Sequence, residues 1–292
     1  MAITNPFKKR IQSLKEEFDI LRKGKESLLV IIDESEIPES VYNSNAIENS
    51  TLTLKETEKI LLEMELSRNV SLREVFEAKN LARVVTYIRT KSQEKELDKE
   101  MILLLHQMLI GGIDDNIAGR FRIKGEYVRV GTHITPAPEH VEHLIESTLI
   151  EYSSNHTSYF LDKIAKFHLD FETIHPFNDG NGRMGRVLIN YQFFRFGFPG
   201  IIIRNKEKKE YYQAFREYNN TKNTKIMEQA IALGLMEALH KRITYLKAKT
   251  IIPLTEYAKR HKKPAPAVIN AARRQTIPAF REKGVWKIGE NL

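Results

Sequence analysis

The chain has 292 residues, of which 41% are hydrophobic and 29% charged, and it contains no cysteine. This composition excludes an intrinsically disordered chain, and the lack of cysteine excludes disulfides and any site built on a thiolate. The net charge is +8, the segment Met1–Lys9 has no leader-like pattern, and no apolar run is long enough to cross a bilayer. We therefore expect a globular protein that neither enters nor spans a membrane and that is, by default, cytoplasmic.

Apolar residues at helical spacing dominate the chain and predict a mainly α protein. A stripe from Ile11 to Leu21 predicts the first helix, and Ser71 with Glu74 forms a capping pattern at the start of another. Further helices are expected at 39–49, 98–110, 139–152, 159–173, 183–196, 207–218 and 224–249. We expect a helical bundle with its core made by these segments.

One stretch departs from the helical pattern. Residues 120–131 alternate β-forming and charged side chains around Gly125, which predicts a short β-hairpin. Pro136 and Pro138 then end the extended stretch.

The last part of the chain differs from the rest in charge. Residues 251–292 hold nine basic and three acidic residues, so they carry +6 of the net +8. Such an excess favours an acidic partner, with nucleic acid the obvious class. Two short helices at 254–260 and 264–274, followed by a closing β segment at 284–288, are similar to excisionase-like winged helix-turn-helix modules, whose basic helix enters the major groove. A small basic domain that binds protein or only improves solubility is the alternative.

The densest group of chemically suited residues lies between His175 and Arg186. Gly180, Asn181 and Gly182 allow the positive φ angles that turn successive backbone N–H groups toward one anion, and a helix N-terminus follows them. Two arginines three residues apart, Arg183 and Arg186, can reach a polyphosphate from the same side of that helix. This arrangement predicts a phosphate-binding loop that differs from a P-loop, because the chain has no Gly-Lys-Ser/Thr sequence.

Two further residues of the same segment have acid–base or metal chemistry. Asp179 supplies a hard oxygen ligand for a magnesium ion beside the phosphates. His175 carries an imidazole that can act as a base near neutral pH.

The whole segment resembles the signature of the Fic family, His-Pro-Phe-x-Asp/Glu-Gly-Asn-Gly-Arg-x-x-Arg, and every specified position is matched. The segments 118–122 and 136–141 also look like those that flank the substrate-docking flap of that family. The resemblance covers about residues 75–240 and implies a helical Fic core. It further implies transfer of AMP from ATP to a Ser, Thr or Tyr hydroxyl of a protein, with pyrophosphate leaving.

The resemblance also implies a role for each matched residue. His175 would deprotonate the acceptor hydroxyl, Asp179 would hold Mg²⁺ between the phosphates, and Phe177 would anchor the loop in the core. The nucleotide phosphates would be bound by Gly180, Asn181, Gly182, Arg183 and Arg186. A flap that pairs with an extended target segment would consist of Ile123, Lys124, Gly125, Glu126, Tyr127, Val128, Arg129 and Val130.

A second, shorter motif lies earlier in the chain. The sequence from Ser44 to Asn49 resembles the inhibitory motif of the Fic family, Ser/Thr-x-x-x-Glu-Gly/Asn. On a helix Ser44 and Glu48 share one face, so the hydroxyl can steady the helix while the carboxylate pairs with Arg186. The pair would occupy the arginine that the terminal phosphate needs, and ATP would bind in a badly aligned pose. Whether Glu48 also positions a water for AMP removal stays open.

We expect three regions: residues 1–74 with the inhibitory helix, residues 75–250 as the catalytic core, and residues 251–292 as the winged-helix-like domain. The expected partners are a target protein, ATP with Mg²⁺, DNA through residues 251–292, and a second copy in a homodimer. One rival interpretation is a DNA-binding regulator in which the Fic fold only senses nucleotide. The others are AMP removal and transfer from a different phosphate donor.

Overall fold

The computed structural model describes residues 5–66 and 70–290. Its helices are α1 (Asn5–Leu21), α2 (Glu26–Ile47), α3 (Leu54–Glu58), η1 (Lys59–Glu63), α4 (Leu72–Lys91), α5 (Lys99–Ile110), α6 (Pro138–Ser154), α7 (Phe160–Ile174), α8 (Asn181–Arg195), η2 (Asn205–Glu207), α9 (Lys208–Thr221), α10 (Lys225–Leu246), α11 (Leu254–Arg260) and α12 (Ala265–Arg273). Its strands are β1 (Arg129–Val130), β2 (His133–Ile134), β3 (Thr250–Pro253), β4 (Ala279–Glu282) and β5 (Val285–Glu290). The mainly α class predicted from the sequence is confirmed.

Two apolar cores share the central helices α7 and α8. Ile189 and Phe193 of α8 pack in a core with α1, α9 and α10, while Met184 and Leu188 pack in a second core with α4, α5 and α6. Because α8 is buried on both sides, its first turn is held in a fixed position. The loop from α7 to α8, which holds the predicted phosphate-binding residues, is therefore mounted on the most buried part of the molecule. No described helix combines the length and apolar character needed to cross a bilayer.

The predicted start of α4 is confirmed, but its capping pattern has a second use. Ser71 is the N-cap residue, and its hydroxyl accepts a hydrogen bond from the Glu74 amide. The Glu74 carboxylate accepts from the Thr51 amide and from the Ser50 and Thr51 hydroxyls. Burial would raise the pKa of Glu74, but these hydrogen bonds hold it below its usual value. The first turn of α4 therefore fixes the segment that follows α2.

The hairpin predicted at 120–131 is wrong in its position. The structure pairs only β1 with β2, and residues 123–128 are irregular around a turn at Gly125. The cause is Arg122, whose buried side chain donates to four backbone carbonyls and whose amide donates to Pro176. Those carbonyls belong to Glu126, Pro136, Ile174 and His175. These bonds hold the segment on the α7–α8 loop, so it does not pair with a partner strand.

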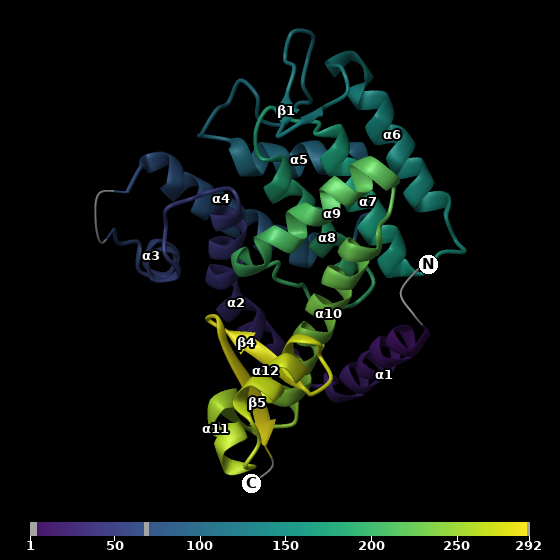
Figure 1. The fold of residues 1–292 in the computed structure, drawn as a ribbon. Coiled ribbons are helices and arrows are strands. Elements are labelled where there is room, and N and C mark those ends of the chain that lie inside the picture. Colours follow the sequence, from purple (N-terminus) through teal and green to yellow (C-terminus); the bar gives the residue numbers. More distant parts are fainter. Residues whose placement is uncertain (1–4, 67–69, 291–292) are drawn as a thin grey trace.

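The C-terminal module, defined as residues 250–290, contains the two short helices and the closing β segment in the predicted ranges. Its antiparallel sheet has the order β3-β5-β4. A small separate core is formed by Ile252, Leu254, Ala258, Val268, Ala272, Ala279 and Ile288. The module lies at the lower end of α10, while β1 lies at the opposite end of the helical body (Figure 1). The boundaries of the three regions stay predictions, and residues 1–4 and 291–292 of the outer two lie outside the described residues.

Candidate active site

Two residues in left-handed conformation bracket the α7–α8 loop. His175 ends α7 with φ 52°, and Gly180 precedes α8 with φ 81°. The expectation that Gly180, Asn181 and Gly182 all adopt positive φ is wrong, since the last two already belong to α8. The anion site is therefore a helix N-terminus entered through a single left-handed glycine, with its first N–H groups unpaired within the helix.

The loop is closed by Asn181, which was predicted to bind phosphate. Its side-chain Oδ1 accepts from the Phe177 amide at 2.9 Å, and its Nδ2 donates to the Phe177 carbonyl at 2.8 Å. The Phe177 ring is fully buried, as predicted for an anchor, and it lies in the core instead of along the cavity. Asn181 can therefore offer a phosphate only its backbone.

His106, which the sequence analysis did not single out, supports the loop from below. Its ring stacks on Phe177 with centroids 3.6 Å apart. Its Nε2 lies 3.0 Å from the Asp179 carbonyl, and its Nδ1 lies 3.0 Å from the Gly119 amide. Burial lowers the pKa of His106 to about 4, so the ring is neutral near pH 7. It joins the segment before the flap to the candidate phosphate loop.

An open cavity lies above this loop. Its volume is about 390 Å³, within the range of roughly 300–1,000 Å³ that suits a small-molecule ligand. The α2–α3 connection, the first turns of α4 and the α7–α8 loop form its walls. His175, Asp179, Gly180, Asn181, Gly182 and Arg183 all line it, so these predicted residues are brought together.

Asp179 lies between two guanidinium groups. Arg183 Nη2 is 3.1 Å from Oδ1, and Arg73 on α4 contacts Oδ2. Glu77 accepts a hydrogen bond from Arg73 Nε at 3.1 Å and forms an ion pair with Arg183, whose Nη1 lies 3.2 Å from Oε1. Burial would raise the pKa of Asp179, but the charge of Arg183, the Gly180 amide and Arg73 hold it below its usual value. The carboxylate is therefore ionised, and sequence reasoning missed Arg73 and Glu77 because nothing in their local pattern marks them.

The donor set of this cavity fits magnesium. Mg²⁺ commonly takes one or two carboxylates and completes its shell with substrate phosphates and water. Asp179 supplies one ionised carboxylate at the cavity wall, and no cluster of three metal-binding side chains occurs in the described part of the chain. Arg73 contacts the same carboxylate and would compete with an ion there.

His175 lies at the cavity with 17% of its side chain exposed. Burial lowers the pKa of His175 to about 4, so its imidazole is neutral at physiological pH. Glu172, one turn earlier in α7, places Oε2 4.0 Å from His175 Nδ1. Burial, together with the nearby charge of Glu48, raises the pKa of Glu172 to about 8. The carboxyl group of Glu172, to which the sequence motif gives no role, is thus mainly protonated and lies next to the candidate base His175.

Arg186 faces α2, as the motif predicts. Its Nη2 donates to Glu48 Oε1 at 2.8 Å and to the Ser44 carbonyl at 2.8 Å, and its Nε donates to Ser44 Oγ at 2.9 Å. Burial would lower the pKa of Arg186, but the charge of Glu48 raises it above its usual value. The expectation that the Ser44 hydroxyl steadies its own helix is not met, because this oxygen accepts from Arg186.

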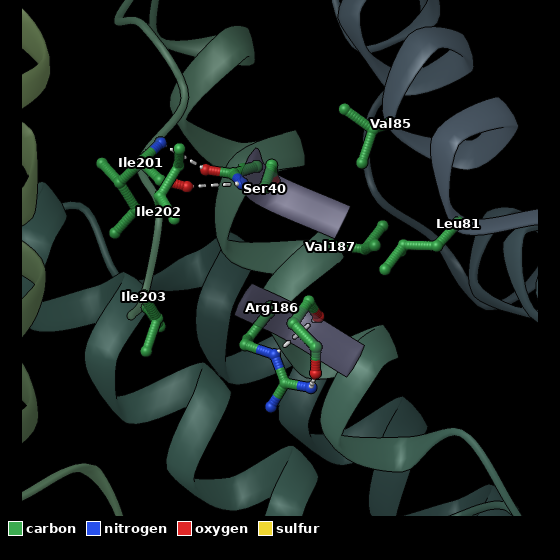
Figure 2. Close-up of a pocket in the computed structure, with 10 residues that line it drawn as sticks. Ser40, Leu81, Val85, Arg186, Val187, Ile201, Ile202 and Ile203 are labelled. Carbon is green, nitrogen blue, oxygen red and sulfur yellow. Dashed lines mark hydrogen bonds between the residues drawn. The ribbon is translucent and has the colours of Figure 1, made fainter. Parts of the chain in front are cut away.

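Glu48 lies directly over the first turn of α8. A Cβ on Gly182 would come 2.2 Å from Glu48 Oε1, so a larger residue there would displace the carboxylate from this position. Glu48 lines the open cavity whereas Arg186, only 6% exposed, does not. Arg186 instead borders a narrow cavity with Ser40, Leu81 and Val187 (Figure 2). The predicted ligand of the terminal phosphate is therefore covered by Glu48.

The backbone conformation of Asn49 explains why the short motif ends in glycine or asparagine. Its φ of 69° is a left-handed conformation that glycine and asparagine tolerate best. Its side-chain Oδ1 accepts from Lys208 Nζ at 2.8 Å.

The flap residues 123–130 are placed around β1. Ile123, Tyr127 and Val130 expose 57%, 67% and 43% of their surface. Glu126 is held by Arg120 through two hydrogen bonds of 2.8 and 2.7 Å. Apolar side chains are therefore exposed on a segment that is fixed at its base.

Comparison with known proteins finds the same family as the motif. Residues 96–193 match the Fic/DOC family. The chain is 32% identical over 186 residues to the protein adenylyltransferase Fic of Nematostella vectensis, which covers 62% of this chain and 43% of that protein. The matches to curated relatives thus span less than half of their length.

Two solved structures share the fold. A Fic domain containing signaling protein from Bacteroides thetaiotaomicron superposes with a TM-score of 0.75 at 24% identity, over 82% of this chain and 97% of that one. A Fic family protein from Desulfovibrio desulfuricans superposes with a TM-score of 0.63 at 18% identity, over 100% of this chain and 98% of that one.

Proposed function

We propose that this chain, which belongs to the Fic/DOC family through residues 96–193, is an autoinhibited enzyme that transfers AMP from ATP to a protein hydroxyl. The acceptor is a Ser, Thr or Tyr side chain of a target protein or of the enzyme itself. The observation that carries the proposal is the pairing of Glu48 with Arg186 beside a cavity that is lined by His175 and by residues 178–183 of the Fic motif.

The neutral imidazole of His175 takes the proton of the acceptor hydroxyl. The hydroxyl oxygen then forms a bond to the α-phosphorus of ATP, and the bond from that phosphorus to the bridging oxygen breaks, so that pyrophosphate leaves. The burial of His175 supports this role, because it keeps the ring unprotonated and hence able to accept a proton at neutral pH.

The start of α8 neutralises the leaving group. The N–H groups of Gly182 and Arg183, in the first turn of α8, have no partner within the helix, and both residues line the cavity. The Arg183 side chain adds a fixed positive charge. A magnesium ion held by Asp179 would supply further charge neutralisation for the phosphates. Such transfer depends mainly on alignment and charge, which these groups are placed to provide.

Glu48 keeps the enzyme in its inhibited state. Its carboxylate occupies the space above Gly182 and uses the guanidinium of Arg186, so the terminal phosphate has neither room nor a partner. ATP then binds with its α-phosphate out of line with His175. Moving Glu48 aside restores the productive pose.

The test uses wild-type protein, Glu48→Gly, and Glu48→Gly with His175→Ala, each incubated with Mg²⁺ and ATP labelled on the α-phosphate. We expect strong labelling only of the Glu48→Gly protein. Mass spectrometry of the labelled protein distinguishes AMP from a phosphate or other phosphate-linked group. A correctly folded Glu48→Gly protein that gains no AMP on itself or on lysate proteins would contradict the proposal, and so would labelling that survives His175→Ala.

Duplex DNA binding by the C-terminal module is the second candidate function. Five of its cations are exposed and form no ion pair within the described chain: Lys259, Lys262, Lys263, Arg273 and Arg274. Its three carboxylates, Glu256, Glu282 and Glu290, are all paired with other side chains. The free positive charge lies around α12, whose exposed Pro266, Ala267 and Asn270 leave room for close approach.

Binding of a labelled 20-base-pair duplex, followed by anisotropy at several salt concentrations, tests this function. Each lost phosphate contact lowers the slope of log K against log salt by about 0.9, so Arg273→Ala with Arg274→Ala should lower it by about 2. Lys209→Ala on α9 is the matched control, because Lys209 is exposed and lies outside the module. Equal slopes for all three proteins would refute the assignment. A homodimer and a cytoplasmic location stay predictions.

A further inference from the structure

We propose that the tip of the β4–β5 hairpin holds the inhibitory helix in its blocking position, with Glu39 as the positioning residue. The inference rests on the proposed function, since it concerns what keeps Glu48 on Arg186. It assigns the C-terminal module a direct part in controlling the active site.

Helix α2 has a weak point directly before Glu39. Pro38 lies inside the helix and has no N–H, so one backbone hydrogen bond is missing there. The helix that follows buries an unusual set of polar residues, namely Glu39, Asn43, Ser44 and Asn45. Because the helix can bend at a proline, the position of this second half depends on what its polar groups contact.

The hairpin tip supplies the contacts of Glu39. Lys283 and Gly284 form the turn in left-handed conformation, with φ of 50° and 77°. Their backbone amides donate to the Glu39 carboxylate, from Lys283 to Oε2 at 2.9 Å and from Gly284 to Oε1 at 3.1 Å. Glu39 is 5% exposed, so both are partly buried, charge-assisted hydrogen bonds.

A buried ionic chain ties the hairpin itself to α10. Arg204 contacts Glu39 and also donates to Glu237 Oε1 at 2.9 Å. Arg281 of β4 donates to Glu237 Oε2 at 2.6 Å. The hairpin therefore rests on α10, which is buried in the helical core, and presses its tip against α2 from a fixed base.

The contact of the hairpin tip with Glu39, which we call the clamp, holds the same helix that carries the inhibitory carboxylate of Glu48. Glu39 precedes Glu48 by nine residues, or about 13 Å along an α-helix. Between them, Asn43 Oδ1 accepts from the Asn205 amide at 3.0 Å, which adds a second anchor. Loss of the tip contact leaves the half-helix after Pro38 with one anchor fewer, so Glu48 leaves Arg186 more often.

The coupling between the hairpin tip and the Glu48–Arg186 pair acts in both directions. If the tip stabilises the pairing of Glu48 with Arg186, then loss of that pairing must loosen the tip by the same free energy. A ligand that pulls the module away from α2 therefore raises AMP transfer. Trp286, the sole tryptophan, lies in β5 with the Arg281 guanidinium 4.5 Å from its ring centroid, so its fluorescence reports on this hairpin.

The experiment compares AMP incorporation by wild type, Glu39→Gln, Lys283→Asn and Glu48→Gly. Glu39→Gln removes the charge that receives both amides, and we expect a rate rise of roughly three- to tenfold, below that of Glu48→Gly. Lys283→Asn is the matched control: it keeps both backbone amides and a residue that tolerates positive φ, and it removes only the exposed contact with Glu58. Its rate should equal that of wild type.

Two further measurements separate a brake from a merely structural role. Glu39→Gln combined with Glu48→Gly should be no faster than Glu48→Gly alone. In Glu48→Gly, the amides of Lys283 and Gly284 should exchange faster with deuterated solvent, and the Trp286 emission should change.

An active Glu48→Gly protein whose hairpin amides and tryptophan behave as in wild type would overturn the clamp, even if Glu39→Gln does not fold. So would a folded Glu39→Gln protein with a wild-type or lower rate. If Glu48→Gly itself transfers no AMP, the proposed function fails, and the clamp is judged separately by amide exchange at residues 44–49 in Glu39→Gln.

Discussion

The candidate phosphate-binding loop and the proposed inhibitory helix are built in opposite ways. The loop holds itself together through contacts within a few residues, such as Asn181 with Phe177 and Asp179 with Arg183. The inhibitory half of α2 is held by residues far along the chain, because Glu48 pairs with Arg186 and Glu39 accepts from Lys283. The loop is closed by local contacts and supported from farther away by His106 and Arg122, whereas the position of the inhibitory half depends entirely on such distant contacts.

This difference indicates which part of the molecule can regulate the proposed activity. Because its closing contacts are local, we expect the loop to change less than the inhibitory half of α2 when distant elements shift. The position of the inhibitory segment depends on its contacts with both α8 and the C-terminal module. Changes in the loop should therefore abolish activity, and changes around α2 should adjust it.

The largest expected effect is on the loop. In the Glu48→Gly background, Arg183→Ala removes the fixed charge beside the phosphates and should lower the rate of AMP transfer by about 10²- to 10³-fold. Steady-state kinetics with labelled ATP measures this. Arg216→Ala, on the exposed part of α9, is the control and should leave the rate unchanged. A drop of less than threefold for Arg183→Ala would mean that the loop does not need this arginine.

The contact between the two regions can be measured at Gly182. In wild type, Gly182→Ala places a Cβ against Glu48 and should destabilise the fold by about 1–3 kcal/mol. In the Glu48→Gly background the clashing carboxylate is gone, and alanine should be nearly neutral because it favours helix. Denaturant unfolding of the four proteins gives the coupling energy. Equal costs in both backgrounds would show that Glu48 does not lie over α8 in solution.

The pH profile sharpens the picture of the loop. Because burial lowers the pKa of His175 to about 4 from an ordinary 6.5, the ring stays a base down to about pH 5. We expect kcat/KM of Glu48→Gly to be flat from pH 8 to 5 and to fall through about pH 4. An acid limb near pH 6.5 would indicate a solvated imidazole in the active state.

The smallest effect is expected at Glu172. Its folded-state pKa of about 8 lies above the usual 4.5, so the folded state binds the extra proton and wild type loses stability as pH rises from about 4.5 to 8. Glutamine cannot ionise, so the Tm gain of Glu172→Gln over wild type should grow by a few degrees between pH 5 and 8. Glu210→Gln, on the exposed side of α9, should show no such trend. A Tm difference that is independent of pH would contradict the raised pKa.

The same contrast explains what the sequence could predict. Most helices, and the cavity residues from His175 to Arg183 that the motif specifies, followed from apolar spacing, caps and one continuous motif, all of which are local. Arg73 and Glu77 did not, because they reach the cavity from α4. The Glu48–Arg186 contact followed from a second short motif. The hairpin at 120–131 was misplaced because Arg122 bonds to carbonyls as far away as His175. The clamp on Glu39 was invisible because its donors lie 244 and 245 residues away.

The two hydrogen bonds of His106 determine which of its ring nitrogens carries the proton. A backbone amide can only donate and a backbone carbonyl can only accept, so Nδ1 must be bare toward Gly119 and Nε2 must carry the proton toward Asp179. Only one tautomer fits. A second proton would set two donors face to face, so acid that protonates His106 separates the flap segment from the nucleotide loop.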